Sequence, residues 1–286
     1  MTTINSLRDR FNQLNIAEKL IVVNIVFFVV PFFLRTIFYL FQLPPFTAIN
    51  YLELSSDFSS LVFRPWTLLS YGFLHGSIGH ILWNMLLLYY AAQFFLNLFS
   101  TQRFINVYFL GILVGGIVFL LSYAVFPVFE NQYPTMVGSS AGVMAVLIFS
   151  CTYMPHQQIR FLFFNLKLMY LGIGLVVLDI LQIPTGNAGG HLAHIGGAVL
   201  GYFYAQQLPK GNDIGRGFER LWTTLINLGS SKSSLKTVYR APKKKARTQH
   251  LSEQEKIDRI LDKISASGYD SLTQEEKAIL FKAGKK

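Results

Sequence analysis

The sequence predicts an all-α, polytopic membrane protein with six spanning helices, and three observations lead to that fold class. Of the 286 residues, 52% are hydrophobic and 14% are charged, and the mean hydropathy is +0.39. A soluble domain usually carries about 25% charged residues. The apolar residues also form six runs, most of them close to the ~20 residues that cross a bilayer. Finally, the connections between the runs alternate in basic charge, as loops on the two sides of a membrane do.

The six apolar runs follow one another between residues 19 and 208. The predicted spans are 19–40, 79–99, 104–128, 138–154, 166–183 and 190–208. The first contains Pro31 and Arg35, and the fourth is short for a bilayer. The long connection 41–74 is rich in aromatic residues. Because such residues gather at the membrane–water interface, we expect this connection to lie there.

Loop charges predict the orientation of the spans. Basic residues occur before the first span and in alternate connections after it: Arg8, Arg10, Lys19, Arg103, Arg160 and Lys167. The remaining connections hold Arg64 with acidic residues, then Glu130, then no charge. Because Lys and Arg are enriched in cytoplasmic loops, this pattern predicts both termini in the cytoplasm. An even number of spans agrees with that orientation.

The basic residues also suggest how the chain is divided. The net charge of +10 comes mostly from the part after Pro209, and a basic tail behind a membrane domain is typical of contact with acidic lipid headgroups. We therefore expect membrane lipid, and no nucleic acid, as a partner. The predicted divisions are a cytoplasmic segment 1–18, a six-helix membrane domain 19–208, a basic linker 209–250 with a short helix near 218–228, and a small helical domain 251–286.

Capping residues predict a helical hairpin in the last domain. Ser252 with Glu255, and Thr273 with Glu276, have the spacing in which two side chains satisfy the first N–H groups of a helix. Gly268 lies between these two boxes and is expected to end the first helix.

A serine cluster opens the short fourth span. It reads Gly138-Ser139-Ser140-Ala141-Gly142 and starts too late to cross a bilayer comfortably, so the segment 131–137 is expected to dip into the membrane. Backbone N–H groups at a helix start can stabilise a developing oxyanion, which suits a nucleophilic serine. The alternative is that these small residues only allow close helix packing.

A histidine motif lies in the sixth span. His194 is followed by Gly197 and Gly201, whose spacing favours close approach to another helix, and His191 precedes it by about one turn. A neutral imidazole beside such a contact can take the proton of a serine hydroxyl on the partner helix. The alternative is a histidine that only forms hydrogen bonds across helices.

The second span supplies a further polar pair. His80 and Asn84 are four residues apart and share one helix face. Two side-chain donors on one face can stabilise an oxyanion, although such a pair can also simply hold helices together. His75 precedes the helix and is expected to hold the loop. Together, the three clusters supply a nucleophile, a base and oxyanion donors on three spans, which favours acyl transfer.

In this order and on these spans, the motifs resemble the rhomboid family. The resemblance covers about residues 20–208. It is carried by Arg64-Pro65-Trp66 with the run from Thr67 to His75, His80 with Asn84, Gly138-x-Ser140, and Ala193-His194-x-x-Gly197.

The resemblance implies an intramembrane serine endopeptidase that uses a Ser/His dyad. Ser140 matches the family nucleophile and His194 the general base. His80, Asn84 and the backbone N–H of Ser140 match the oxyanion hole. The implied substrates are single-span membrane proteins cleaved near the outer membrane boundary, with no cofactor and no metal ion. The resemblance implies no acidic third member of the catalytic group. Asp179 in the fifth span is therefore expected to be a hydrating or capping residue.

Three positions depart from the family pattern. Thr67 stands after Trp66 where the family has arginine, and Arg64 is the candidate replacement. Ala141 follows the nucleophile where glycine is common. Met144 stands where many members have an aromatic residue against the catalytic histidine. These changes are expected to lower activity without removing a catalytic atom.

The segment 257–281 resembles a small domain appended to rhomboids in some Bacteroidetes-type bacteria. It predicts a bacterial inner membrane, with both termini cytoplasmic. The main alternative function is a rhomboid-like protein that binds transmembrane clients without cleaving them, but its usual mark, loss of the serine or histidine, is absent here. A transporter would predict inverted repeats, and a zinc protease would predict His-Glu-x-x-His. The sequence contains neither pattern.

Overall fold

The computed structural model describes residues 3–161, 164–229 and 253–284. Contacts between Cα atoms divide the chain into two compact units, Met1–Ser231 and Lys232–Lys286. The latter part of the predicted linker 209–250 lies outside the described residues.

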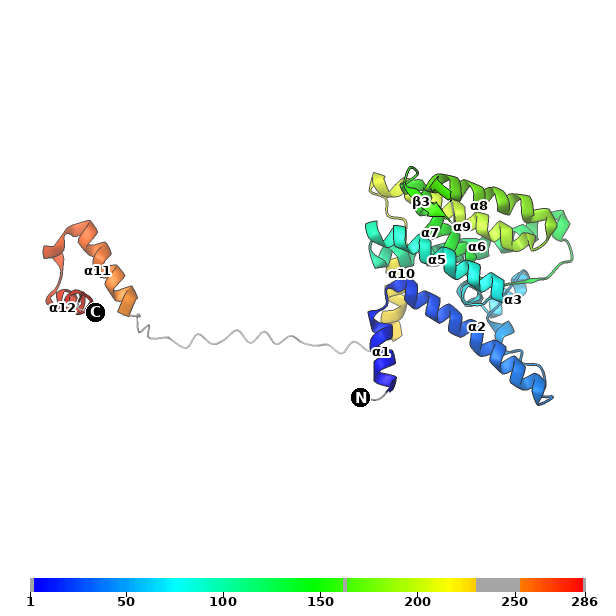
Figure 1. Ribbon diagram of the computed structural model, residues 1–286, viewed down its shortest axis with the longest axis horizontal. Coiled ribbons are helices and arrows are strands. Elements are labelled where there is room, and N and C mark those ends of the chain that lie inside the picture. Colours follow the sequence, from blue (N-terminus) through cyan, green and yellow to red (C-terminus); the bar gives the residue numbers. More distant parts are fainter. Residues whose placement is uncertain (1–2, 162–163, 230–252, 285–286) are drawn as a thin grey trace. The chain divides into compact units, whose positions relative to one another are not determined.

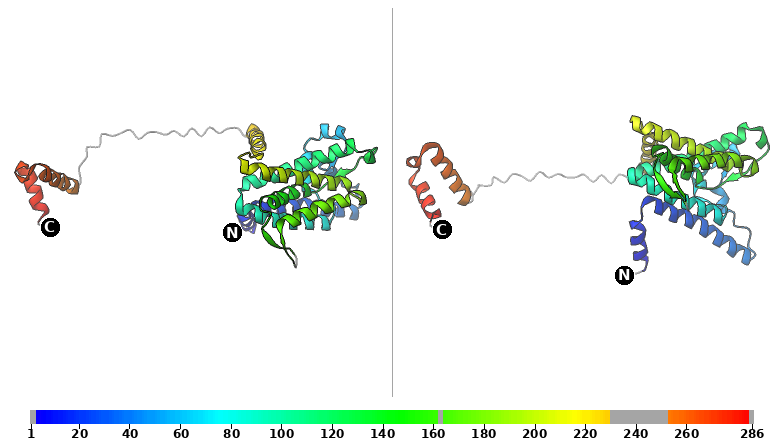
Figure 2. Two further views of the ribbon diagram at one scale, coloured as in Figure 1. Left: turned by 90° about the horizontal axis from the view of Figure 1, so that it is seen from above. Right: turned by 45° about the horizontal axis from the view of Figure 1, so that its top comes forward.

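Six helices form the body of the first unit, which confirms the predicted all-α membrane fold (Figure 1). They are α2 (Ile16–Leu40), α5 (Ile78–Leu98), α6 (Thr101–Val125), α7 (Ser140–Tyr153), α8 (Leu168–Gln182) and α9 (Ala188–Gln207). By length and composition, α2, α5, α6 and the stretch Leu168–Thr185 can each cross a membrane, and α7 is a shorter apolar helix. Two additional views show α5 to α9 running alongside one another (Figure 2).

Side-chain caps define where several of these helices begin. Asn15 and Glu18 form a capping box at the start of α2, which places that start ahead of the predicted residue 19. Ser77 and Ser100 each accept a hydrogen bond from the N–H group three residues on, at the starts of α5 and α6. Each observed helix begins and ends within three residues of the predicted span.

Short elements connect the spans. Those of the first unit are α1 (Thr3–Gln13), η1 (Ala48–Tyr51), β1 (Leu54–Ser55), α3 (Phe58–Phe63), α4 (Thr67–Ser70), η2 (Tyr71–Phe73), η3 (Pro127–Phe129), β2 (Thr135–Met136), β3 (Gln158–Phe161), β4 (Phe164–Lys167), η4 (Ile183–Thr185), η5 (Leu208–Lys210) and α10 (Gly215–Gly229). Antiparallel pairing joins β1 to β2, with Leu54 opposite Met136, and β3 to β4, with Ile159 opposite Leu166. The fifth span therefore starts later than the predicted residue 166, because residues 164–167 form a strand.

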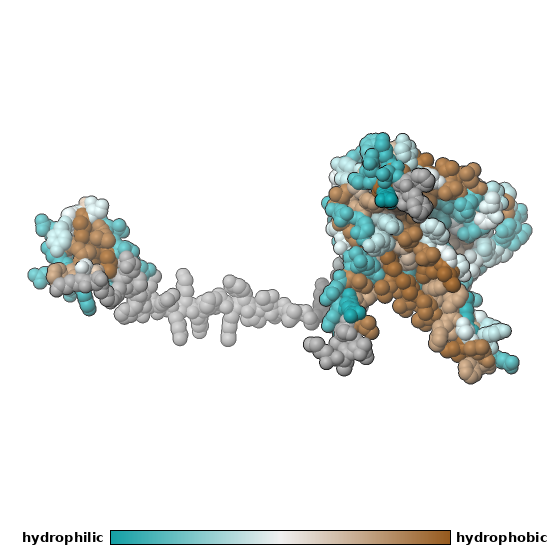
Figure 3. Space-filling model, viewed as in Figure 1, coloured by the Kyte–Doolittle hydropathy of each residue, from teal (hydrophilic) through white to brown (hydrophobic). Residues whose placement is uncertain are grey.

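Helix α2 contacts the rest of the bundle near its N-terminus and then diverges from it (Figure 1). Its buried residues are Ala17, Leu20 and Asn24, all in the first half. Pro31 lies inside the helix without ending it. Beyond Asn24 most side chains are apolar and exposed, and Figure 3 shows a continuous hydrophobic area along the helix. Such a large exposed apolar surface fits contact with lipid.

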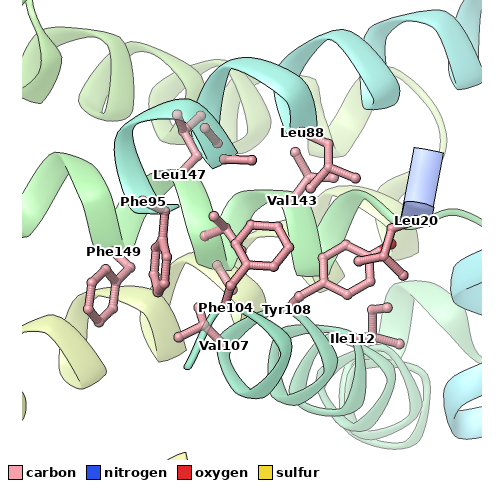
Figure 4. Close-up of a cluster of buried hydrophobic side chains, with 14 of the residues drawn as sticks. Leu20, Leu88, Phe95, Phe104, Val107, Tyr108, Ile112, Val143, Leu147 and Phe149 are labelled. Carbon is pink, nitrogen blue, oxygen red and sulfur yellow. The ribbon is translucent and has the colours of Figure 1, made fainter. Parts of the chain in front are cut away.

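Helix α7 occupies the centre of the bundle. Every residue from Ala141 to Cys151 is buried, and the helix packs against α5, α6, α8 and α9. An aromatic and aliphatic cluster fills the space between α7, α5, α6 and α2 (Figure 4). Its labelled members are Leu20, Leu88, Phe95, Phe104, Val107, Tyr108, Ile112, Val143, Leu147 and Phe149.

Glycines allow the closest helix contacts. A Cβ atom on Gly197 of α9 would lie 2.1 Å from the carbonyl oxygen of Ala141, and one on Gly201 would lie 2.3 Å from that of Ala145. On the other side of α7, a Cβ atom on Gly111 of α6 would lie 2.5 Å from the Cβ atom of Ala145. The predicted close approach of the sixth span is therefore confirmed, and it brings α9 against α7 along the line that holds Ser140 and His194.

The chain after α9 is tied to the start of α6. Asp213 accepts a hydrogen bond from Tyr204 and forms an ion pair with Arg103, whose Nη2 atom is 3.0 Å from Oδ2. Burial raises the pKa of Asp213, but the hydrogen bonds from Tyr204 and Arg103 outweigh it and hold that pKa below its ordinary value.

The second unit contains the predicted helical hairpin. It consists of α11 (Glu253–Ser267), η6 (Tyr269–Ser271) and α12 (Gln274–Ala283). Thr273 and Glu276 form the predicted capping box, and α11 ends before Gly268, which has a φ of +78°. The proposed cap at Ser252 lies outside the described residues. Lys263 and Glu276 join the two helices through an ion pair of 2.8 Å.

Candidate active site

Ser140 is the first residue of α7. The first helical N–H group with a backbone partner is that of Val143, which donates to the carbonyl of Ser139, and Ser139 makes no side-chain cap. The N–H groups of the first turn, including that of Ser140, therefore lack intrahelical partners. This leaves a serine hydroxyl beside free backbone donors.

The segment before Ser140 is held by the connection between α2 and α5. The N–H group of Gly138 donates to the carbonyl of Tyr71 over 3.0 Å, and the Tyr71 hydroxyl donates to the carbonyl of Ile112 over 2.6 Å. The β1–β2 pairing adds a second attachment two residues earlier. Through these bonds a long surface connection fixes the position of the serine.

The connection between α2 and α5 is itself anchored around Thr67, the position that departs from the family pattern. The Trp66 indole N–H donates to the carbonyl of Tyr51 over 2.9 Å, and the Arg64 guanidinium lies 4.2 Å from the centroid of the Tyr51 ring. Thr67 donates to the carbonyl of Arg64 over 2.7 Å. Arg64 thus anchors the loop beside Trp66 through a cation–π contact.

His194 lies directly against the serine. Its Nε2 atom is 2.6 Å from Oγ of Ser140, and the two residues come from α9 and α7. The close glycine contacts between these helices bring the imidazole within reach. The two residues predicted to form a dyad are therefore brought together.

His80 and Asn84 of α5 line the same cavity as Ser140 and His194. A Cβ atom on Gly138 would lie 2.9 Å from the His80 ring and 3.4 Å from Oγ of Ser140. The His80 ring and the Ser140 hydroxyl therefore lie on either side of Gly138, close to each other. Asn84 is buried, and its amide donates to the carbonyl of His80 over 3.0 Å. One amide proton is thus used within α5, and the second remains for an external acceptor.

His75 fills the predicted loop-holding position. It is buried, and its Nε2 atom lies 3.3 Å from Oγ of Ser139. Its ring also meets that of His80 edge to face at 5.1 Å. His75 therefore supports the residues beside Ser140 without contacting that hydroxyl in the structure.

Asp179 contacts two histidines that the sequence did not assign to it. It was expected to be a hydrating or capping residue, and in the structure its Oδ1 atom lies 2.8 Å from Nδ1 of His194 and 2.8 Å from Nδ1 of His191. The carboxylate is buried between α8 and α9. An aspartate in the last turn of an apolar span was the available signal, because such a residue needs partners inside the bundle.

These three residues also form the described group that has the composition of a metal site. Their ligand atoms lie within 4.8 Å of one another. The 2.8 Å separations are also those of charge-assisted hydrogen bonds between the carboxylate and the two imidazoles.

A cavity of about 380 Å³ opens onto these groups. Its polar lining includes His80, Asn84, Ser140, Asp179 and His194. Its apolar lining comes from α5, α7 and α8, namely Trp83, Leu87, Val143, Met144, Leu175 and Leu178. Polar groups converge in an otherwise apolar space, which is typical of a binding or catalytic site.

Met144, the departure nearest the site, is buried and lines this cavity. It packs with Ile148 and Ala198. The Met144 side chain thus occupies the wall between the serine and α8, where a flexible thioether can adapt to its neighbours.

Comparison with known proteins gives two family matches. The Rhomboid domain family matches residues 62–210, which contain His80, Asn84, Ser140, Asp179 and His194. A family of unknown function (DUF6576) matches residues 244–286, which include the helical hairpin.

Several curated proteins are similar to the chain. RHOMBOID-like protein 12, mitochondrial, of Arabidopsis thaliana is 29% identical over 157 residues, which cover 51% of this chain and 47% of that protein. Presenilin-associated rhomboid-like protein A, mitochondrial, of Danio rerio is 28% identical over 154 residues, covering 52% and 37%. The Homo sapiens presenilin-associated rhomboid-like protein, mitochondrial, is 28% identical over 136 residues, covering 46% and 35%. The chain spans less than half the length of these relatives.

The same relatives overturn one expectation. The sequence predicted a bacterial inner membrane with both termini in the cytoplasm, whereas these similar proteins are all named as mitochondrial. That predicted location is therefore wrong, and the multi-pass membrane character is retained.

Proposed function

The chain belongs to the rhomboid family, and we propose that it is an intramembrane serine endopeptidase with Ser140 as nucleophile and His194 as general base. The observation that carries this proposal is the 2.6 Å separation of Ser140 Oγ and His194 Nε2 inside a cavity of the membrane bundle. A serine and a neutral imidazole at that distance form the activated pair that acyl transfer requires.

In the first step, Oγ of Ser140 attacks the carbonyl carbon of the scissile peptide while its proton passes to Nε2 of His194. The carbonyl oxygen becomes an oxyanion. The Ser140 N–H, the free proton of the Asn84 amide and the His80 imidazole surround the place where it forms. Donors fixed before the reaction stabilise this charge without reorganisation, which is usually the largest part of such catalysis.

In the second step the C–N bond breaks, and His194 returns its proton to the leaving amine. The acyl group remains on Ser140 as an ester. Water then attacks the ester carbonyl, His194 takes a proton from that water, and the serine leaves with the proton. The net reaction is peptide plus water giving a carboxylic acid and an amine, with both residues restored.

We propose a transmembrane segment as the substrate, because members of this family act on such segments. The apolar wall of the active-site cavity supports this choice. Trp83 and Leu87 of α5 line that cavity and also line a second cavity of about 550 Å³ that continues toward Leu168 and Leu171 of α8. The two cavities thus share apolar lining between α5 and α8, and we propose that a substrate segment enters toward Ser140 on this side.

The names of the similar proteins favour a mitochondrial membrane as the location. The proposed division of the chain places the reaction in 19–208 and leaves 209–250 and 251–286 as a basic linker and a helical domain without a catalytic role.

The alternative is a catalytically weak or inactive rhomboid-like protein that binds transmembrane clients. The Met144 and Thr67 departures favour it, and the close Ser140–His194 contact opposes it. Binding without cleavage would not need a hydroxyl held against an imidazole.

The test is cleavage of a tagged single-span reporter by the purified protein in detergent. We expect cleavage by the parent and none by Ser140→Ala or His194→Ala. Ser150→Ala and His156→Ala are matched controls, because the Ser150 hydroxyl donates to the carbonyl of Val146 within its own helix and His156 is exposed on the α7–α8 connection. A folded parent that cleaves no reporter, resists fluorophosphonate labelling and still captures reporters would replace the protease proposal with client binding.

A further inference from the structure

Asp179 connects two histidines through a single oxygen atom. Its Oδ1 lies 2.8 Å from Nδ1 of His191 and 2.8 Å from Nδ1 of His194. An ionised carboxylate has no proton to give, so each imidazole donates its Nδ1–H to that oxygen. The side chains of α8 and α9 are thereby joined at the site.

The bond to Asp179 indicates which nitrogen of His194 carries the proton. A neutral imidazole has one N–H, and the bond to Asp179 places it on Nδ1. The Nε2 atom then presents a lone pair to Oγ of Ser140 at 2.6 Å. In this tautomer the serine hydroxyl donates to His194, which is the arrangement needed before proton transfer.

We propose that Asp179 is a positioning residue for the proposed serine protease, acting through His194. It holds the imidazole in the Nδ1–H tautomer and in the rotamer that faces Ser140. Its negative charge also stabilises the imidazolium that forms when the serine proton moves to Nε2. The inference rests on the proposed function and adds a third residue to a site expected to use only two.

His191 has a supporting part in this arrangement. A buried carboxylate with too few donors costs free energy, and His191 supplies the second N–H to the same oxygen. Because His191 and His194 lie three residues apart on α9, they reach Asp179 from the same helix face. Their rings meet nearly edge to face at 5.7 Å, which leaves both Nδ1 atoms directed to the carboxylate.

The first test separates chemistry from substrate binding. In Asp179→Asn the amide oxygen can still accept both Nδ1–H groups, but the negative charge that stabilises the imidazolium is lost. We expect kcat to fall by about tenfold or more and KM to change by less than about threefold. Asp179→Glu restores the charge and is expected to recover part of kcat. The control Asp57→Asn replaces a half-buried carboxylate that caps α3 with an amide that can also cap, and it is expected to leave both constants unchanged.

A kcat of Asp179→Asn within twofold of the parent, in folded protein, would overturn the proposal. The same holds if Asp179→Asn and Asp179→Glu lose activity only in proportion to a loss of folded protein, measured by gel filtration and thermal unfolding.

The second test does not depend on activity or on a destabilising variant. In parent protein labelled with ¹⁵N-histidine, NMR is expected to show Nδ1 of His194 protonated and Nε2 unprotonated, with the signal assigned by its loss in His194→Gln. A proton on Nε2 would overturn the positioning role even if the protein cleaves its reporter. The expected tautomer in a protein that cleaves no reporter would instead retain the geometry and reject the proposed function.

Discussion

The imidazole of His80 lies so close to Gly138 that a Cβ atom on this glycine would be 2.9 Å from its Cε1 and Nε2 atoms. Gly138 also has a φ of +135°, a backbone conformation that L side chains rarely adopt. Both facts make glycine necessary two residues before Ser140. The glycine lets the chain turn into α7 while the proposed oxyanion donor stays beside the serine.

Gly138→Ala is therefore expected to reduce reporter cleavage at least tenfold, because the methyl group displaces His80 and the backbone strain costs about 1–3 kcal/mol. Gly76→Ala is the control, since its Cβ would meet only Val137 at 3.9 Å. Initial cleavage rates and thermal unfolding of both variants check the prediction. Equal rates for Gly138→Ala and the parent would show that the site tolerates a side chain here.

Gly201→Ala is expected to destabilise the bundle without touching the site. Its Cβ would lie 2.3 Å from the carbonyl oxygen of Ala145, so α9 must move away from α7, at a cost of about 1–3 kcal/mol. In Gly174→Ala, by contrast, the new methyl group meets nothing within 4 Å. A lower unfolding temperature for the first variant and an unchanged or higher one for the second is the expected result in detergent.

Asn84→Ala tests the oxyanion donors. Removing one such donor typically lowers kcat by about 10²–10³-fold, and we expect a loss in that range with little change in KM. Asn97→Ala removes an exposed amide from the same helix and serves as the control. A loss confined to KM would mean that Asn84 binds the substrate and does not stabilise the transition state.

The Asp213–Arg103 ion pair predicts a pH-dependent stability outside the bundle. Because the pKa of Asp213 is lowered in the folded protein, the stabilisation is present above its ordinary value of 3.8 and is lost as pH falls through the lower folded pKa. Asp213→Asn should unfold at a lower temperature than the parent at pH 6, and this difference should shrink below about pH 3.8. A difference that stays constant from pH 6 to pH 3 would contradict the assignment.

The length of the apolar runs was sufficient to locate the six membrane helices. The spans are long apolar runs whose composition is imposed by lipid, so their limits are visible without tertiary information. The glycine contact between α7 and α9 was also predictable, because Gly197 and Gly201 have the spacing that lets two backbones approach. The resemblance of the motifs around Ser140 and His194 to the rhomboid family then predicted the dyad.

The partners of Asp179 were not predictable in the same way. They depend on the rotation of α8 about its axis, which hydrophobicity does not define when most of its surface is apolar. The β3–β4 hairpin was missed for a related reason, since its four-residue strands are too short to give a clear period of two. The anchoring of Arg64 on Tyr51 required knowledge of the intervening turn.

The two walls of the active-site cavity differ in how firmly they are held. Helix α7 is enclosed by α5, α6, α8 and α9, whereas only 17% of the apolar window in the stretch Leu168–Thr185, which contains α8, is buried inside the protein. Amide protons of α7 should thus exchange only when the bundle opens as a whole, and those of α8 through smaller, local openings. Evolution can consequently alter the shape of the entrance by substitutions in α8 without altering the helix that carries Ser140.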